Sequence, residues 1–325
     1  MLFHHHGYVS TNPRVQVAAG IGLDRPAELP DEMDVLIVGS GPAGMIAAAQ
    51  LAMFPDVHTR IIERRPHRLE IGQADGIQAR SVETFQAFGF ASEIIDEAFD
   101  LTSMAFWNPA EDDADTIVRT SLAEDDPEGV SEFPHLIVNQ ARILDWFAEY
   151  MKNSPTRARP DYGWAFETLE DTNDGEHPVL VTLRRTVDAQ GNALEDPASG
   201  PTRQVRAKYV VGADGAGSRV RKAIGHTLTG DAANHAWGVM DALADTDFPD
   251  IRTKCAIHSS SGSILLIPRE GGHLFRMYVD LGEVPADDNH QVRQTPLEEI
   301  IRRAQQILRP YTLDVKAVSY THLTL

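Results

Sequence analysis

Three glycines stand at a spacing that lets a protein backbone approach a phosphate group. They follow the apolar run Val35–Val38, which predicts a buried strand, and precede the small-residue stretch Met45–Met53, which predicts a helix. In such a G-x-G-x-x-G turn the glycines allow a tight turn, close approach to a pyrophosphate and close helix–strand packing. The helix N-terminus adds unpaired N–H groups and a positive dipole end. The candidate phosphate-binding residues are Gly39, Gly41, Pro42, Ala43 and Gly44.

Two acidic residues at strand ends extend this interpretation. The predicted strand Thr59–Glu63 ends in a carboxylate, where the ribose of a dinucleotide donates hydrogen bonds. Much later, the apolar strand Lys208–Gly212 runs into Asp214 and Gly215, and a helix follows. An Asp-Gly pair alone is most simply a turn. After a nucleotide-binding motif, the pair predicts a second contact with the bound cofactor.

The charge of the chain limits its partners. The 325 residues include 29 Lys plus Arg against 48 Asp plus Glu, which gives a formal net charge of −19. So acidic a surface argues against nucleic acid and against anionic membranes as partners. No apolar run approaches the roughly 20 residues that span a bilayer. The N-terminal residues lack a signal-peptide pattern.

The single cysteine and a histidine triplet are the remaining reactive candidates. Cys255 cannot form an internal disulfide and fits a reducing compartment, so we expect a cytoplasmic protein. It lies in an apolar strand, which favours a buried and unreactive thiol. His4, His5 and His6 could bind a metal weakly, but no further ligand is spaced to complete a site. We expect no metal centre and interpret the triplet as a solvated tail.

Several stretches resemble the group A FAD-dependent aromatic hydroxylases, in the branch of the phenol 2-monooxygenases and 3-hydroxybenzoate 4-monooxygenases. The matching stretches are Gly72–Ile77, Glu132–Arg142, Ala236–Asp241, Phe248–Arg252 and Ile267–Tyr278. The resemblance covers Asp34 to about Val318. It is specific because the stretches recur in order, although no single one is diagnostic.

The resemblance implies an α/β fold of mixed α+β character. A glutathione-reductase-like FAD-binding Rossmann domain would accompany an antiparallel-sheet substrate domain. We expect an N-terminal extension at 1–30, an FAD-binding domain at 31–100 and 132–233 with a β-meander at about 162–209, a substrate-binding domain at 101–131 and 234–318, and an anomalous tail at 319–325.

Periodicity predicts helices at 80–88, 91–98, 140–151 and 297–308, and strands at 104–107, 135–138, 165–170, 179–184, 204–209, 237–244, 254–258, 263–268 and 274–281. The acidic runs Ala110–Asp115 and Glu124–Glu128 are most simply solvated loops.

The resemblance also implies roles for residues around a substrate. Asp75 is expected beside a substrate phenol and would help remove its proton, since a phenol has a pKa of about 10 and the phenolate ring is the better nucleophile. Tyr278 is expected to bridge the substrate hydroxyl and the flavin. His135 and Lys254 together could hold a benzoate carboxylate, because an ammonium inside an apolar pocket needs an anion. This pair favours 3-hydroxybenzoate over plain phenols.

Each of these residues also has a purely structural interpretation. Asp75 could be a turn residue, and Tyr278 could be a strand aromatic that packs in the core. Lys254 could point to solvent from an edge strand, and His135 could satisfy a backbone carbonyl.

Other positions match flavin contacts of the family. These are Arg64, Gln73, Gln140, Arg142, Asp214 and Gly215. Gln140 and Arg142 open a predicted helix, where contact with an anion is physically sensible. Arg269 and Arg276 are candidate substrate-binding residues that could also steer the flavin or the pyridine nucleotide. Both could equally be ordinary surface arginines.

We therefore expect a monooxygenase that uses FAD, O₂ and NADPH (or NADH) to hydroxylate a phenolic aromatic ring. Flavin C4a-hydroperoxide would transfer OH in a site that excludes water. The sequence has no second G-x-G-x-x-G, so the nicotinamide would visit the flavin transiently. Whether the protein is a homodimer stays open.

The sequence allows one alternative and argues against two others. The family's later Gly-Asp flavin motif is missing and Ser319–Leu325 does not resemble the expected aromatic strand, which indicates a truncated FAD-binding fragment without turnover. A flavin-dependent halogenase would need a Trp-x-Trp-x-Ile-Pro segment, which the sequence lacks. A nicotinamide-only dehydrogenase would leave Gly212–Arg219 without a role.

Overall fold

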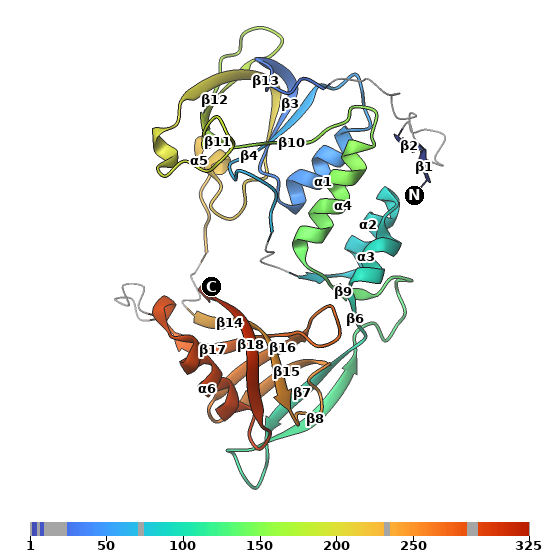
Figure 1. Ribbon diagram of the computed structural model, residues 1–325, viewed down its shortest axis with the longest axis vertical. Helices are drawn as coiled ribbons and strands as arrows, with labels where there is room; N and C mark the ends of the chain where they lie inside the picture. The colour runs from blue at the N-terminus through green and yellow to red at the C-terminus, as the bar shows by residue number, and fades with distance from the viewer. Residues whose placement is uncertain are drawn as a thin grey trace. The chain divides into compact units, whose positions relative to one another are not determined.

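The computed structural model describes residues 2–4, 7–9, 25–70, 75–230, 235–284 and 292–324. The chain divides into two compact units (Figure 1): Met1–Ala74, Phe88–Phe90 and Gln140–Thr229 form the first, and Asp75–Ala87, Ala91–Asn139 and Gly230–Leu325 form the second. The expected FAD-binding domain contained 75–100 and 132–139, most of which group with the second unit. The functional domain bounds therefore stay a proposal.

The first unit is built on a six-stranded sheet of order β10-β4-β3-β13-β12-β11. Its strands are β3 (Glu32–Val38), β4 (Thr59–Glu63), β10 (Pro160–Tyr162), β11 (Trp164–Asp171), β12 (Val179–Arg185) and β13 (Thr202–Gly212). β10, β4, β3 and β13 are parallel, whereas β13, β12 and β11 form an antiparallel meander. The carboxyl ends of β3, β4 and β13 therefore meet at one edge of the sheet, the usual position for a nucleotide site.

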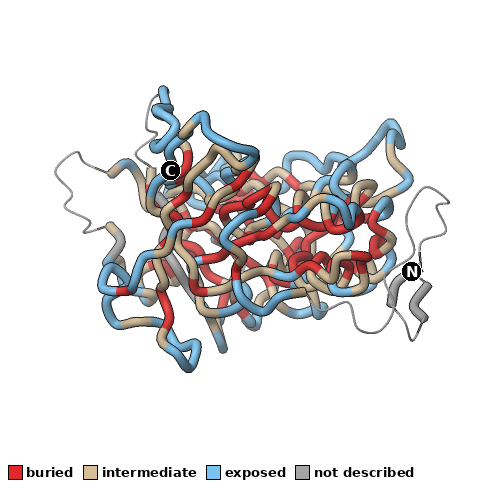
Figure 2. The backbone as a smooth tube through the Cα atoms, turned by 90° about the horizontal axis from the view of Figure 1, so that it is seen from above, coloured by how far each residue is buried: buried red, intermediate tan, exposed pale blue. Residues whose placement is uncertain are grey.

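Helices α1 (Pro42–Leu51) and α4 (Gln140–Lys152) contact each other, and α1 also contacts β3 and β4. Small residues make the close approach possible, because Ala48 and Ala49 of α1 are buried. On α4 the predicted apolar positions Ile143, Leu144 and Phe147 are buried at helical spacing. Figure 2 shows the buried stretches of both units in red. The unit also contains the short pair β1 (Leu2–His4) and β2 (Gly7–Val9), the 3-10 turn Pro197–Ser199 and helix α5 (Arg219–Ala223).

The second unit contains a seven-stranded sheet of order β18-β14-β17-β16-β15-β7-β8. Its strands are β7 (Ser103–Pro109), β8 (Ile117–Glu124), β14 (His235–Thr246), β15 (Lys254–Ser259), β16 (Gly262–Pro268), β17 (Phe275–Glu283) and β18 (Leu313–Thr324). The antiparallel sheet predicted from the strands at 237–281 is confirmed for β14, β17, β16 and β15, and β7 joins it by a parallel pairing with β15. The tail expected to be anomalous continues β18, which pairs with β14 through Thr324.

The two faces of this sheet differ. One face joins helix α6 (Leu297–Ile307) in a buried cluster that includes Met240, Cys255, Leu266 and Met277. Cys255 is buried, as predicted. Side chains alternate along a strand, so the residues between these core positions belong to the other face. The 3-10 turn Val292–Gln294 precedes α6.

A three-stranded sheet of order β5-β9-β6 completes the second unit. It consists of β5 (Gly76–Ile77), β9 (His135–Ile137) and β6 (Phe99–Leu101), with helices α2 (Ala79–Phe88) and α3 (Ala91–Glu97) between β5 and β6 in sequence. Asp75 directly precedes β5, and its backbone oxygen accepts a hydrogen bond of 2.9 Å from the Val138 amide. No described helix combines the length and the apolar character that crossing a bilayer requires.

Candidate active site

The glycine turn after β3 is packed so closely that two of its positions exclude any side chain. Gly39 has a φ of +103°, and a Cβ there would lie 2.5 Å from the backbone oxygen of Ala213. A Cβ at Gly44 would lie 1.9 Å from the backbone oxygen of Gly39. The Gly39 amide donates to the Ile62 oxygen at 2.9 Å. The turn is thus held between the ends of β4 and β13, and the two glycines are steric requirements.

The N-terminus of α1 is open to an anion. Gly41 is its N-cap and Pro42 its first residue; within the described part of the chain, no side chain caps it and its first turn carries no acidic residue. Pro42 and Ala43 are exposed. A Cβ at Gly41 would meet no described atom within 4 Å. Unpaired N–H groups at an uncovered helix N-terminus fit a pyrophosphate.

Glu63 lies at the end of β4 and is tied to the same turn. Its Oε2 accepts hydrogen bonds from the Ser40 amide at 3.1 Å, the Ser40 hydroxyl at 2.9 Å and the Arg65 guanidinium at 3.0 Å. Its Oε1 accepts from the Arg65 amide at 3.0 Å. Burial alone would raise the pKa of Glu63, but the hydrogen bonds from Arg65 and Ser40 outweigh it and lower that pKa. A carboxylate oxygen has two lone pairs, so Oε1 can still accept from a ribose hydroxyl. These residues fit FAD.

The Asp-Gly segment after β13 lies against the glycine turn, as the Gly39 geometry shows: the Asp214 Cα would be 3.0 Å from a Cβ at Gly39. The Asp214 carboxylate accepts from the Ser218 hydroxyl at 2.5 Å and from the Arg219 amide at 2.6 Å. It therefore caps α5 in this structure. Gly215 has a φ of +83°, which a turn here requires.

The other predicted flavin positions are more scattered. Gln140 is the first residue of α4, and the exposed Arg142 donates to Asp145 at 2.8 Å. Arg64 is exposed, whereas its neighbour Arg65, which is not among the predicted cofactor-binding residues, binds Glu63. Gln73 lies outside the described residues, as do His5 and His6 of the histidine triplet.

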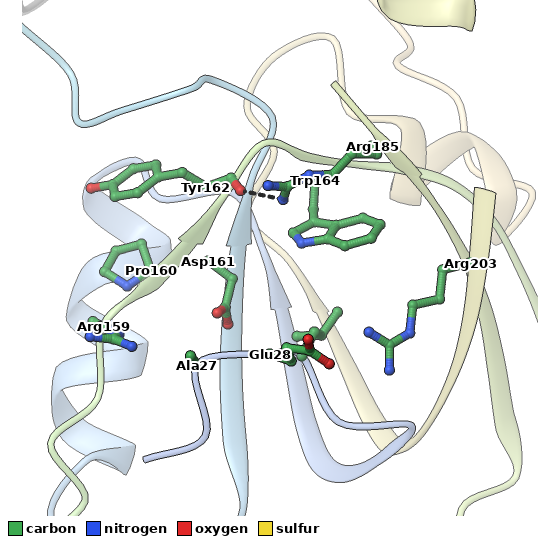
Figure 3. A pocket seen from close by; sticks show the side chains of 10 residues that line it. Ala27, Glu28, Arg159, Pro160, Asp161, Tyr162, Trp164, Arg185 and Arg203 are labelled. Atoms are coloured by element: carbon green, nitrogen blue, oxygen red, sulfur yellow. Dashed lines mark hydrogen bonds between the residues drawn. The ribbon is translucent and has the colours of Figure 1, made fainter. Parts of the chain in front are cut away.

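A pocket of about 480 Å³ lies elsewhere in the first unit (Figure 3). Its lining includes Asp161, Trp164, Arg185 and Arg203, and none of the predicted cofactor-binding residues. The Arg185 guanidinium lies 5.0 Å from the centre of the Trp164 ring and donates to the Tyr162 backbone oxygen at 3.0 Å.

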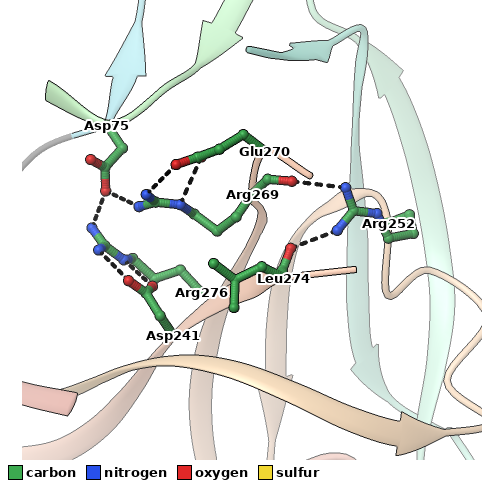
Figure 4. A network of polar contacts seen from close by, with 7 residues as sticks. All are labelled: Asp75, Asp241, Arg252, Arg269, Glu270, Leu274 and Arg276. Carbon is green, nitrogen blue, oxygen red and sulfur yellow. Dashed lines mark hydrogen bonds and ion pairs between the residues drawn. The ribbon is translucent and has the colours of Figure 1, made fainter. Parts of the chain in front are cut away.

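In the second unit, Asp75 is the centre of a buried chain of charges (Figure 4). Its carboxylate forms ion pairs with both Arg269 and Arg276. Arg276 also donates to both oxygens of Asp241, at 2.6 and 2.8 Å, and Arg269 donates to both oxygens of Glu270, at 3.1 and 2.9 Å. Asp75 is 6% exposed, Arg269 4% and Arg276 8%. The interpretations of Asp75 as a simple turn residue and of the two arginines as surface residues are therefore wrong.

The charges in this cluster stabilise one another. Burial disfavours the charge of Arg276, but hydrogen bonds with Asp241 and the charge of Asp75 outweigh burial and raise the pKa of Arg276. The neighbouring Tyr278, two residues along β17, acts in the same direction.

Tyr278 and Lys254 lie on the sheet face opposite α6. Tyr278 is half-buried between Val239 of β14 and Leu265 of β16. Lys254 is half-buried beside Met104 of β7. β15 lies between β16 and β7, so the interpretation of Lys254 as an edge-strand residue is wrong. This face combines apolar side chains such as Val239 and Leu265 with the charged side chains of Asp241, Arg276 and Lys254.

His135 is buried, and its Nδ1 lies 3.1 and 3.2 Å from the two carboxylate oxygens of Asp125. A carboxylate, not a backbone carbonyl, is therefore its partner. Asp125 belongs to a run predicted as a solvated loop, and it is exposed and lies in a bend directly after β8. Among the described residues, no hydrogen bond or ion pair joins His135 to Lys254. The described residues also contain no group of three or more His, Cys, Asp or Glu arranged to hold a metal.

Two curated proteins illustrate what this chain is similar to. It is 46% identical over 321 residues to "3-hydroxybenzoate 4-monooxygenase" of Comamonas testosteroni, covering 98% of this chain and 49% of that protein. It is 29% identical over 290 residues to "Phenol 2-monooxygenase fsqG" of Aspergillus fumigatus, covering 89% of this chain and 46% of that protein. The chain thus spans about half the length of these curated relatives.

A solved structure and a family profile agree with this likeness. The structure of p-nitrophenol 4-monooxygenase PnpA from Pseudomonas putida DLL-E4 superposes with a TM-score of 0.67 at 16% identity, covering 91% of this chain and 69% of that one. It supports the mixed α/β fold, as predicted. The profile of the family described as "FAD binding domain" matches residues 32–325. The chain belongs to this FAD binding domain family, in agreement with the resemblance seen in its sequence.

Proposed function

We propose that this chain is part of a FAD-dependent monooxygenase that hydroxylates a phenolic aromatic ring with NADPH or NADH and O₂. The observation that carries the proposal is the buried Asp75–Arg276 ion pair, with Tyr278 two residues after Arg276 on the same face of β17 and next to Val239 and Leu265. Apolar side chains beside a few convergent polar groups suit an aromatic ring that bears one hydroxyl. The names of the two curated relatives support the same chemistry.

Gly39, Gly41, Pro42, Ala43 and Gly44 would hold the pyrophosphate of FAD, and Glu63 would hold its ribose. Arg64, Gln73, Gln140, Arg142, Asp214 and Gly215 are proposed as further contacts. Bound FAD supplies the redox chemistry that activates O₂ for transfer to the ring. We also propose that the nicotinamide cofactor visits transiently, that the protein acts in the cytoplasm and that it can form a homodimer.

Tyr278 would take part in moving the proton of the substrate hydroxyl. Its side chain lies on the same face of β17 as that of Arg276, and its hydroxyl would donate a hydrogen bond to a phenolate oxygen. The guanidinium beside it stabilises negative charge on that oxygen. Asp75, held by two arginines, would fix these groups and accept a hydrogen bond rather than act as a strong base.

For the substrate we propose 3-hydroxybenzoate over plain phenol, because Lys254 presents a half-buried ammonium on the same sheet face as Tyr278 and His135 lies in the same unit with a carboxylate at its Nδ1. An anionic partner would offset the desolvation of the ammonium.

The test compares Lys254→Met with wild type. We expect the KM for 3-hydroxybenzoate to rise about tenfold, the worth of a charge-assisted hydrogen bond, and the KM for phenol to change less than about twofold. Lys316→Met, at an exposed lysine, is the matched control. Equal losses on both substrates would dismiss the carboxylate anchor. Flavin binding without turnover in wild type would refute the hydroxylase itself.

A further inference from the structure

The hairpin between β16 and β17 carries Arg269 and turns through two consecutive glycines. Gly271 and Gly272 follow each other with φ of +83° and +82°, and a Cβ at either would meet no described atom within 4 Å. The hairpin is closed by a hydrogen bond of 2.8 Å from the Arg269 amide to the Leu274 oxygen. Two consecutive glycines at positive φ give a loop with a large conformational freedom to lose. Contacts from outside must therefore fix the position of Arg269.

Arg252 supplies such contacts at both ends of the hairpin (Figure 4). One terminal nitrogen of its guanidinium donates to the Leu274 oxygen at 2.6 Å, and the other donates to the Arg269 oxygen at 2.9 Å. The planar fork of a guanidinium can reach two acceptors at once, which the single ammonium of a lysine cannot match in geometry.

The same guanidinium also contacts the small sheet that carries Asp75. Its central carbon lies 4.8 Å from the centre of the Phe99 ring in β6. Phe99 and Gly76 both pair with Ile137 of β9, from its two sides, and Asp75 directly precedes Gly76. Arg252 therefore touches both segments whose side chains meet in the Asp75–Arg269 ion pair.

We infer that Arg252 is a positioning residue that fixes the Arg269–Leu274 hairpin against the β5-β9-β6 sheet and so holds Arg269 on Asp75. Within the described residues Arg252 forms no ion pair, so its contribution is geometric. Its burial lowers its pKa, consistent with a cation that contacts only carbonyl oxygens and a ring. The inference about the hairpin stands on these contacts alone; its consequence for substrate rests on the proposed function.

The first test is hydrogen exchange on the 325-residue chain. Arg252→Lys and Arg252→Ala should speed exchange of the Arg269 amide about tenfold, since a hydrogen bond from a charged donor is worth that much or more. Arg302→Ala, which removes an exposed arginine from α6, should leave that amide unchanged. If Arg252→Ala fails to fold, Arg252→Lys decides. Unchanged exchange in a folded Arg252→Lys variant would overturn the inference.

The second test separates positioning from general stability. In Arg252→Lys we expect the KM for 3-hydroxybenzoate to rise severalfold, while FAD retention and the melting temperature stay at the wild-type values. A loss of FAD retention together with a lower melting temperature would mark Arg252 as merely structural and contradict the inference. Faster exchange in a chain whose wild type does not turn over 3-hydroxybenzoate would refute the proposed function and leave the role of Arg252 in the hairpin intact.

Discussion

At the scale of single residues, Asp75 is the central member of a buried cluster of charged side chains in the second unit. Its carboxylate is buried and shared by Arg269 and Arg276, and each arginine has a second carboxylate, Glu270 or Asp241. The charges alternate in sign along this chain of five side chains, so each offsets the desolvation of its neighbours. Neutralising the central member would leave two buried cations beside each other.

We predict that Asp75→Asn lowers the free energy of unfolding by about 3 to 5 kcal/mol, the usual result of breaking a buried ion pair from one side. Urea unfolding of the purified chain measures this. Asp314→Asn is the control, because its carboxylate is exposed and, among the described residues, pairs with Lys316 alone at the surface, where such pairs contribute about 0 to 1 kcal/mol. Equal stability of Asp75→Asn and wild type would contradict the cluster described here.

The lowered pKa of Glu63 predicts the direction in which the stability of the fold changes with pH. Its pKa is lowered in the folded chain, since hydrogen bonds from Arg65 and Ser40 outweigh burial, which alone would raise it. A carboxyl group of lowered pKa stabilises the fold fully above its unfolded pKa, about 4.3, and this contribution is lost as the pH falls through the lower folded value. Wild type should therefore lose stability below about pH 5 more steeply than Glu63→Gln. Urea unfolding at a series of pH values tests this, and parallel curves would refute it.

At the scale of elements, substitutions at the junction of β3 and α1 distinguish an effect on folding from an effect on FAD binding. Gly44 has no room for a methyl group beside the Gly39 oxygen, whereas Gly41 has open space. Gly44→Ala should therefore destabilise the chain and abolish FAD retention. Gly41→Ala should melt within about 2 °C of wild type and bind FAD about tenfold more weakly, because the methyl group blocks approach of the pyrophosphate.

Gln50→Ala, at an exposed position on the same helix, should retain both stability and FAD. Thermal melts and titration with FAD distinguish these variants. A stable Gly41→Ala chain that bound FAD as wild type does would remove this turn from the cofactor site.

Strands and helices with a regular apolar period could be predicted from the sequence, but pairing partners could not. The four strands β14, β15, β16 and β17 and helices α4 and α6 were predicted close to their observed bounds. β8 has only Ile117 buried, so it leaves no alternating apolar signal. The parallel pairing of β7 with β15 joins segments far apart in the chain, and no local pattern encodes such a pairing.

For the whole molecule, the two parts of the candidate site differ in how much of each could be predicted from the sequence. The glycine turn and Glu63 were predicted because a short contiguous motif specifies a backbone shape. Asp241, Glu270 and Arg252 were missed, since their roles depend on which side chains the fold brings to Asp75 and to its hairpin. Resemblance to a family identified Asp75, Tyr278, Arg269 and Arg276 as candidates, and only the structure gives them their partners.

The most direct measurement of the central claim, that the Gly39–Gly44 turn of this chain holds FAD, is visible absorbance after incubation with FAD and removal of free cofactor. Wild type should retain the bands of oxidised flavin, and Gly41→Ala, prepared identically and shown by thermal melting to be folded, should retain clearly weaker bands, in line with its weaker binding of FAD. A folded wild-type chain that is colourless would contradict the account. Equal retention by Gly41→Ala would contradict it as well, because the flavin would then be bound without the turn.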